Sequence, residues 1–135
     1  MKVVFDTNIL VSALLTPGGD CDRVVRLAGI GVVQPCLDSR LMAEYEDVLP
    51  REGLAIPAQE SDRLLDDLRA FSEVVAAPPL AARLPHASDL PFLEVAAAAQ
   101  AILVTGNLRH FPKNQRGGVA VMGPDELLDL LREKA

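Results

Sequence analysis

Three acidic residues, Asp6, Glu44 and Asp89, are the first candidates for chemistry because each lies beside an apolar segment. Asp6 directly follows the apolar residues 3–5, and Asp89 comes three residues before Phe92, where a buried helical stripe is expected to begin. Carboxylates that gather in one place raise one another's pKa unless a cation compensates their charge. A group of these three would suit a hard divalent ion such as Mg²⁺, which prefers oxygen ligands and often joins one or two carboxylates to a phosphate. An ion held there would activate a water and shield the charge of a phosphodiester.

Each of the three acids also has an ordinary structural explanation. Asp6 is a common type of residue for capping the helix that would follow it. Glu44 follows Leu41 by three residues and precedes Val48 by four, so it lies beside an apolar helical stripe from which a long side chain reaches solvent. Asp89 stands where a helix begins, and a carboxylate there complements the helix dipole. Taken singly, these explanations compete well with a shared site.

The elements that must position these acids alternate along the chain. Short apolar segments, expected to be strands, are separated by segments whose apolar residues recur at helical spacing. The expected strands cover residues 2–5, 32–36, 73–75, 102–104 and 119–122. This alternation predicts an α/β fold in which a central parallel sheet of four to five strands is covered by helices on both faces. Neither a repeat nor a second domain is apparent, so residues 1–135 are expected to form one domain.

Polar residues follow two of the expected strands. Asp6-Thr7-Asn8 follows the first strand, and Thr105-Gly106-Asn107 follows the strand at residues 102–104. In open parallel sheets, ligands bind beyond the carboxyl ends of the strands. Asp6 and Asn107 are therefore expected at the same edge of the sheet.

The charge balance does not favour a broadly basic surface for nucleic acid. The 135 residues carry a net charge of −6, and the sequence pI is near 4.8. One loop departs from this balance, because Arg109, His110, Lys113 and Arg116 follow Asn107 closely. These side chains could hold flanking phosphates of an RNA, or the segment could simply be a solvated loop.

The two cysteines and the hydrophobic segments suggest a cytoplasmic protein. Cys21 and Cys36 lack the spacing of a metal site, so both are expected to be reduced thiols without a chemical role. The N-terminal apolar run is too short for a secretion signal, and no stretch approaches a membrane span.

Four segments in the right order resemble a known family. They are VFDTNILVSALL, DSRLMAEYEDVL, DLPFLEVAAAAQAILVTGNLRHFP and VAVMGPDELL. Together they resemble PIN-domain proteins over essentially the whole chain, and most closely the VapC-like toxin components of toxin–antitoxin systems. The resemblance implies a PIN-like three-layer α/β/α sandwich with Mg²⁺- or Mn²⁺-dependent endoribonuclease activity.

The resemblance also assigns roles to residues and suggests partners. Asp6, Glu44 and Asp89 match the family's catalytic and metal-binding acids. The implied partners are an RNA substrate, a cognate antitoxin of a type II pair and a second copy of the chain in a homodimer, with no membrane association.

Less central residues are placed by the same resemblance. Many PIN domains carry a further Asp where this chain has Asn107, and an amide brings no charge to a second metal. Asn8 and Thr105 resemble polar residues that brace the family's site, and Ser12, one turn after Asn8, is expected to face the same cleft. His86 lies in a loop that is more acidic in similar proteins.

Two other readings of the sequence compete with a nuclease. The first is a PIN-like module that binds RNA or a protein without turnover, which Asn107 and the His86 loop keep open. The second is another acidic α/β domain. A phosphorelay receiver would need an acceptor Asp on a middle strand and a Lys after a late strand, and neither is apparent. A haloacid-dehalogenase-like enzyme would need Asp at the position of Asn8.

Overall fold

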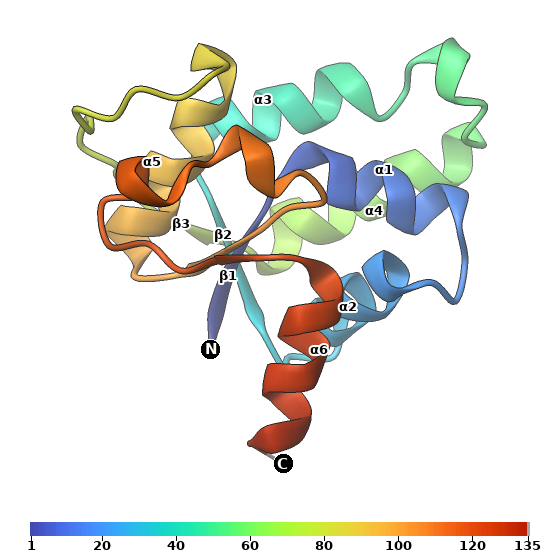
Figure 1. The fold of residues 1–135 in the computed structure, drawn as a ribbon. Helices are drawn as coiled ribbons and strands as arrows, with labels where there is room; N and C mark the ends of the chain where they lie inside the picture. Colours follow the sequence, from blue (N-terminus) through green and yellow to red (C-terminus); the bar gives the residue numbers. More distant parts are fainter. Residues whose placement is uncertain (135) are drawn as a thin grey trace.

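The computed structural model describes residues 1–134 and shows five strands and six α-helices in alternation (Figure 1). The strands are β1 (Lys2–Phe5), β2 (Gln34–Leu37), β3 (Glu73–Val74), β4 (Ile102–Val104) and β5 (Val121–Met122). The helices are α1 (Thr7–Leu15), α2 (Asp20–Gly29), α3 (Ser39–Val48), α4 (Ala58–Phe71), α5 (Leu90–Ala99) and α6 (Pro124–Glu133). Short 3₁₀ turns lie at η1 (Glu52–Leu54), η2 (Ala87–Asp89), η3 (Leu108–His110) and η4 (Lys113–Gln115).

The strands form one parallel sheet in the order β3-β2-β1-β4-β5. The central pair, β1 and β4, is in register from Val3 opposite Ile102 to Phe5 opposite Val104. In Figure 1, α5 lies to the left of the strands, whereas α2, α4 and α6 lie to the right, and α1 and α3 run above the carboxyl ends. The expected α/β/α arrangement with a parallel sheet is confirmed.

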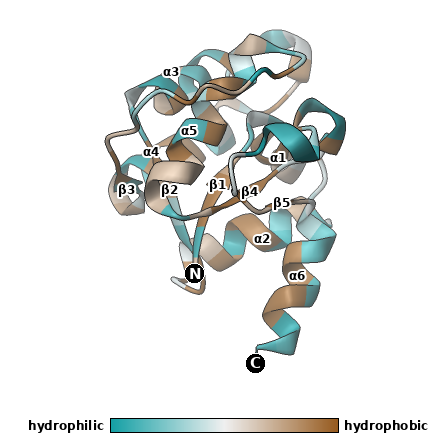
Figure 2. Cartoon of the chain, turned by 60° about the vertical axis from the view of Figure 1, so that its left-hand side comes forward, coloured by the Kyte–Doolittle hydropathy of each residue, from teal (hydrophilic) through white to brown (hydrophobic). Residues whose placement is uncertain are grey.

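Burial on both faces explains why β1 and β4 are continuous apolar runs. Val3, Val4, Leu103 and Val104 are fully buried. Such strands occur where helices cover both sides of a parallel sheet. Figure 2 shows the same contrast, with hydrophobic central strands and an α6 that alternates between hydrophilic and hydrophobic residues. Among residues 1–134, no helix is long and apolar enough to cross a bilayer.

Several strand boundaries differ from those expected, and β3 ends at Val74, one residue early. The second strand begins at Gln34, because the N–H groups of Val32 and Val33 both donate to the carbonyl of Leu27 and close the end of α2. The last strand covers only Val121–Met122, because the N–H of Val119 donates to Arg116 in the preceding turn. In contrast, the expected place of Asp89 at a helix start is confirmed, because Asp89 ends the turn η2 and is the N-cap residue of α5.

Candidate functional site

The carboxyl ends of β1 and β4 place Asp6 and Thr105 side by side at the centre of the sheet. The N–H of Asp6 donates to the carbonyl of Val104 at 2.9 Å, which continues the strand pairing to the end of β1. The chain leaves β1 toward β2 on one side and β4 lies on the other, so the strand order reverses here. This is the point in a parallel sheet at which a ligand-binding crevice opens.

Asp6 is directed to Thr105 and not to the helix that follows it. Asp6 occupies the position before α1, but its side chain makes no capping hydrogen bond. Its Oδ2 instead accepts from Thr105 Oγ1 at 2.8 Å and from Asn8 Nδ2 at 3.4 Å. Asn8 Oδ1 in turn accepts from the N–H of Gly106 at 3.1 Å. Helix capping therefore does not explain Asp6, and Asn8 and Thr105 hold its carboxylate in place.

The electrostatic environment of Asp6 lacks a compensating positive charge. Burial raises the pKa of its carboxyl to about 6, and the charges of Asp89 and Glu44 contribute to the rise, against the hydrogen bond from Thr105. The residue is only 5% exposed. The three acids named from the sequence are thus brought near enough for their charges to act on one another, although Glu44 and Asp89 come from distant segments.

Glu44 is fixed by its own hydrogen bond and by that of its neighbour Tyr45. Its Oε2 accepts a short hydrogen bond from Thr7 Oγ1, next to Asp6. The neighbouring Tyr45 is buried and donates its hydroxyl to the carbonyl of Phe5, the residue before Asp6. These two contacts hold the middle of α3 against the end of β1.

Local sequence explains where α3 begins. Asp38 precedes the helix, and its Oδ1 accepts from the N–H groups of Arg40 and Leu41 at 3.0 and 3.1 Å. Asp38 is therefore the N-cap residue of α3. It fixes the start of the helix one turn before Glu44.

Asp89 presents a carboxylate oxygen that is buried and unsatisfied. Its side chain is 14% exposed, and its Oδ2 has no hydrogen-bond partner. His110 Nδ1 lies 2.9 Å from this oxygen, but the contact is not aligned as a hydrogen bond. An unpaired buried carboxylate oxygen is costly, and a cation beside it removes that cost.

The donors at this edge fit a hard divalent ion that keeps part of its water shell. Within residues 1–134, no set of three His, Cys, Asp or Glu side chains lies close enough to enclose one ion. Mg²⁺ is ordinarily held by one or two carboxylates with several waters, so a closed set is not required. Mutual repulsion at Asp6 and the unsatisfied oxygen of Asp89 are the two features that a bound cation would relieve.

The sequence of this chain matches the model of a known family. The model of the PIN domain covers residues 2–109. The chain belongs to the PIN-domain family. PIN domains are generally nucleases, and these nucleases typically use divalent metals.

Solved structures share the fold of this PIN domain at low sequence identity. VapBC2 from Rickettsia felis, bound to a DNA fragment from its promoter, contains a chain with 17% identity and a TM-score of 0.61, covering 91% of this chain and 98% of that one. VapBC-1 from nontypeable Haemophilus influenzae gives 17% identity and a TM-score of 0.60 over 93% and 99% of the two chains. A domain of a functionally unknown protein from Methanocaldococcus jannaschii has 17% identity and a TM-score of 0.53, covering 89% of this chain and 88% of that one. No curated protein matches the sequence.

Ser12 does not join the acidic residues of the PIN domain. It is exposed on α1. Burial raises the pKa of the Cys21 thiol, and a hydrogen bond with Ser12 opposes this rise. The hydroxyl of Ser12 is therefore turned toward α2, and the expectation that it faces the cleft of Asn8 is not met.

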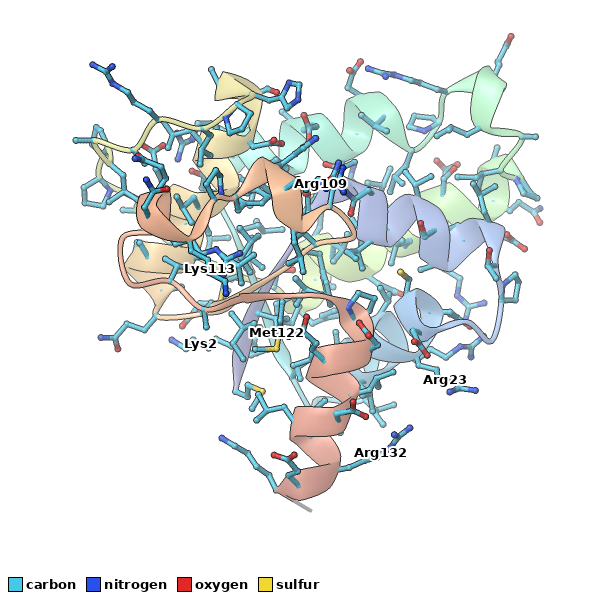
Figure 3. All side chains as sticks on the ribbon, in the orientation of Figure 1. Lys2, Arg23, Arg109, Lys113, Met122 and Arg132 are labelled. Carbon is cyan, nitrogen blue, oxygen red and sulfur yellow. The ribbon has the colours of Figure 1, made fainter. Side chains whose placement is uncertain are left out.

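The arginines and the lysine that follow Asn107 lack the ion pairs that most other cations of the PIN domain form. Lys2, Arg23, Arg26, Arg40, Arg51, Arg69 and Arg132 all form ion pairs. Among the described residues, Arg109, Lys113 and Arg116 form none, although Arg116 Nε donates to the carbonyl of Phe111 at 2.8 Å. Arg109 and Lys113 are exposed and extend from the orange segment after β4 (Figure 3).

An internal ion pair that the sequence did not predict links α3 to α5. Glu94 on α5 is buried, and its Oε1 accepts from Arg40 Nη1 at 2.7 Å. Its Oε2 accepts from the N–H of Leu80 at 2.8 Å. Arg40 lies one turn before Glu44, so the pair joins α3 to α5 just below the site. A single Glu within the otherwise apolar stretch LPFLEVAAAA was the available signal.

Proposed function

We propose that this PIN domain is a ribonuclease that hydrolyses RNA phosphodiesters with Mg²⁺ or Mn²⁺. The observation that carries the proposal is the environment of Asp6. A buried carboxylate at the centre of the sheet has two acidic neighbours, Glu44 and Asp89. Burial raises its pKa to about 6, and the charges of these neighbours add to the rise. Such an arrangement stores unfavourable electrostatic energy, which a divalent ion would release on binding.

The proposed roles follow from what each carboxylate already contacts. Asp6 and Asp89 would hold the ion, because Asp6 is fixed by Thr105 and the buried Oδ2 of Asp89 accepts no hydrogen bond. Glu44 accepts from Thr7 through one oxygen, and its other oxygen would bind the ion or orient the attacking water. A bound ion supplies an acidified water and shields the phosphate charge. By family likeness, cleavage would leave a 5′-phosphate, and no protein nucleophile takes part.

Metal dependence is the direct test of this function. A labelled single-stranded RNA should be cleaved by the purified protein in Mg²⁺ or Mn²⁺ and left intact in excess EDTA, with activity restored by adding the metal back. Products separated on a denaturing gel measure the rate. Cleavage that continues in EDTA would refute the proposal, and binding of RNA without cleavage in either metal would favour the non-catalytic module.

Unpaired cations offer a surface for the RNA backbone. We expect Arg109→Gln combined with Lys113→Gln to weaken RNA binding, because neither side chain has an acidic partner to lose. The slope of log affinity against log salt should fall by about 0.7 for each phosphate contact removed. Fluorescence anisotropy at several salt concentrations measures both quantities.

Arg63 provides the matched control for that experiment. It is an exposed cation on α4 that also forms no ion pair among the described residues, and it lines a groove between α2 and α4. Arg63→Gln should leave the salt slope unchanged. Arg63→Gln removes one positive charge and the loop variant removes two, so a control effect half as large as that of the loop variant would indicate that only the net charge matters. The loop would then have no specific role.

An antitoxin is the proposed protein partner, with the chain acting as toxin of a type II pair. The support is the structural likeness to chains found in VapBC complexes. Co-expression of a tagged chain with the product of an adjacent gene should yield a stable complex, and light scattering of the free chain should give the mass of a homodimer. Failure of any neighbouring gene product to co-purify would count against the toxin assignment, while the nuclease assay stays independent of it.

A further inference from the structure

A continuous chain of polar contacts links Asp6 to Asp89 through the segment that follows β4. Thr105 Oγ1 donates to Asp6 and accepts from the N–H of Asn107 at 3.0 Å. Asn107 Nδ2 lies 2.8 Å from His110 Nε2, and His110 Nδ1 lies 2.9 Å from Asp89 Oδ2. The two aspartates that would hold the ion are thus connected by Thr105, Asn107 and His110.

The contacts of the imidazole define which ring nitrogen carries the proton. This contact is not aligned as a hydrogen bond, but a lone pair on Nδ1 at 2.9 Å from a carboxylate oxygen would be repelled, so we assign the proton to Nδ1. A neutral imidazole then has an unprotonated Nε2, which accepts from the amide N–H of Asn107. The amide nitrogen of Asn107 is occupied by this contact, and its Oδ1 is the atom left for a ligand or a water.

The geometry points to His110 as a positioning residue of the proposed metal site, held as the Nδ1–H tautomer by Asn107 and directed at Asp89. This inference rests on the proposed function, because Asp89 is a ligand only if a metal binds. It also accounts for the amide at position 107. A carboxylate there would face Nε2 without a proton to share, unless the ring were doubly protonated. Asn107 and His110 therefore act as a matched pair.

A local frame keeps the imidazole in this place. The N–H of His110 donates to the carbonyl of Asn107 at 3.1 Å within η3, and the next residue, Phe111, is fully buried. The ring of His86 lies against the other side of the imidazole, with centroids 4.4 Å apart. Within the described residues, the side chain of His86 makes no polar contact with Asn107 or Asp89. Its backbone carbonyl accepts from the N–H of Asp89 at 3.1 Å, and His86→Ala keeps that carbonyl, so this change is the control that removes only the ring packing.

The tautomer is tested on the wild-type protein without metal. The chain has only two histidines, and His86→Ala assigns the remaining ring. Long-range ¹⁵N–¹H NMR at about pH 8.5, well above the ordinary histidine pKa of about 6.5, should show His110 protonated at Nδ1. Protonation at Nε2 would overturn the inference. The tautomer is read from the wild-type spectrum, and the variant serves only to assign the two rings.

Mn²⁺ affinity, measured by calorimetry, tests the positioning role. His110→Ala should weaken binding about tenfold, the effect typical of removing a partner of a metal ligand. His110→Asn places an N–H near Nδ1 and should recover most of the affinity, whereas His110→Gln should not. The Mn²⁺ affinity of His86→Ala should stay within about twofold of that of the wild type. This is a much smaller change than the loss of affinity caused by removing a residue that holds a metal ligand.

The outcomes separate this inference from the proposed function. Unchanged Mn²⁺ affinity in His110→Ala, or equal losses in the Asn and Gln variants, would overturn the positioning role and leave the nuclease intact. Absence of Mn²⁺ binding by the wild-type chain would overturn the proposed function and the positioning role together. Melting temperatures in EDTA show whether a variant is folded before its affinity is compared.

Discussion

Asp6→Asn is expected to lower metal-dependent RNA cleavage by more than about a hundredfold, since even partners one step removed from a metal contribute about ten- to a hundredfold. The substitution keeps the size of the side chain, and an amide oxygen can still accept from Thr105. The substitution removes the negative charge at the end of β1, and the ion would need this charge in order to bind. Initial rates at saturating Mn²⁺ and Mg²⁺, with calorimetric Mn²⁺ affinity beside them, measure the effect.

Asp62→Asn is the matched control for this change. Asp62 is an exposed acid on α4 without an ion pair among residues 1–134, so its removal alters net charge equally and touches no part of the site. The Asp62→Asn protein should cleave RNA at the wild-type rate. An Asp6→Asn protein that cleaves as fast as the control would show that the activity does not reside at this edge of the sheet.

The same Asp6→Asn change is expected to stabilise the metal-free protein at neutral and higher pH. The pKa of Asp6 in the folded state is about 6, above its ordinary value of 3.8. The contribution of this group to stability is therefore fully present below about pH 4 and is lost as the pH rises through about 6. Above that range, the ionised side chain costs the folded state about 2–3 kcal/mol, and asparagine carries no such cost.

Urea unfolding in EDTA across this pH range tests the stability prediction. The difference between Asp6→Asn and wild type should be largest near pH 8, about 2–3 kcal/mol, and should shrink as the pH falls toward about 4. Added Mn²⁺ should raise the stability of the wild type and leave the variant unchanged. A variant that is less stable than wild type at pH 8 would show that Asp6 is not strained by its neighbours.

Both predictions concern one carboxylate because function and stability oppose each other there. An apolar or amide side chain would suit the buried end of β1 better than a charge does. Asp6 is retained at an electrostatic cost, and a strained ionisable group in a crevice is characteristic of a functional site. This cost distinguishes Asp6 from Asp62, which is exposed to solvent and can be ionised without an electrostatic cost of this kind.

Much of the fold and part of the site follow from the sequence because their signals are local. The alternation of buried strands with amphipathic helices determines a parallel sheet, since a run such as residues 3–5 is stable only when helices cover both of its sides. The position of Asp6 after the first strand and of Asp38 before α3 can also be read directly. Parallel strands then bring Asp6 and Thr105 to the same edge, whatever the details of packing.

Tertiary structure decided the features that depend on distances between remote segments. Asp6 binds Thr105, which is 99 residues away, instead of capping its own helix, and both arrangements agree with the sequence. The start of β2 was set by the chain reversal after α2, which draws residues 32 and 33 away from the sheet. Ser12 turns toward Cys21 and not toward the acids.

The contact between His110 and Asp89 was also decided by tertiary structure and not by local sequence. Helical spacing relates each of these residues only to its near neighbours, and neither residue type signals the other. Their approach is set by how the segment after β4 folds back over the turn before α5. The sequence by itself therefore determined which carboxylates could form a site at the sheet edge. The packing of α3, α5 and the loop after β4 decided which side chains hold those carboxylates in place.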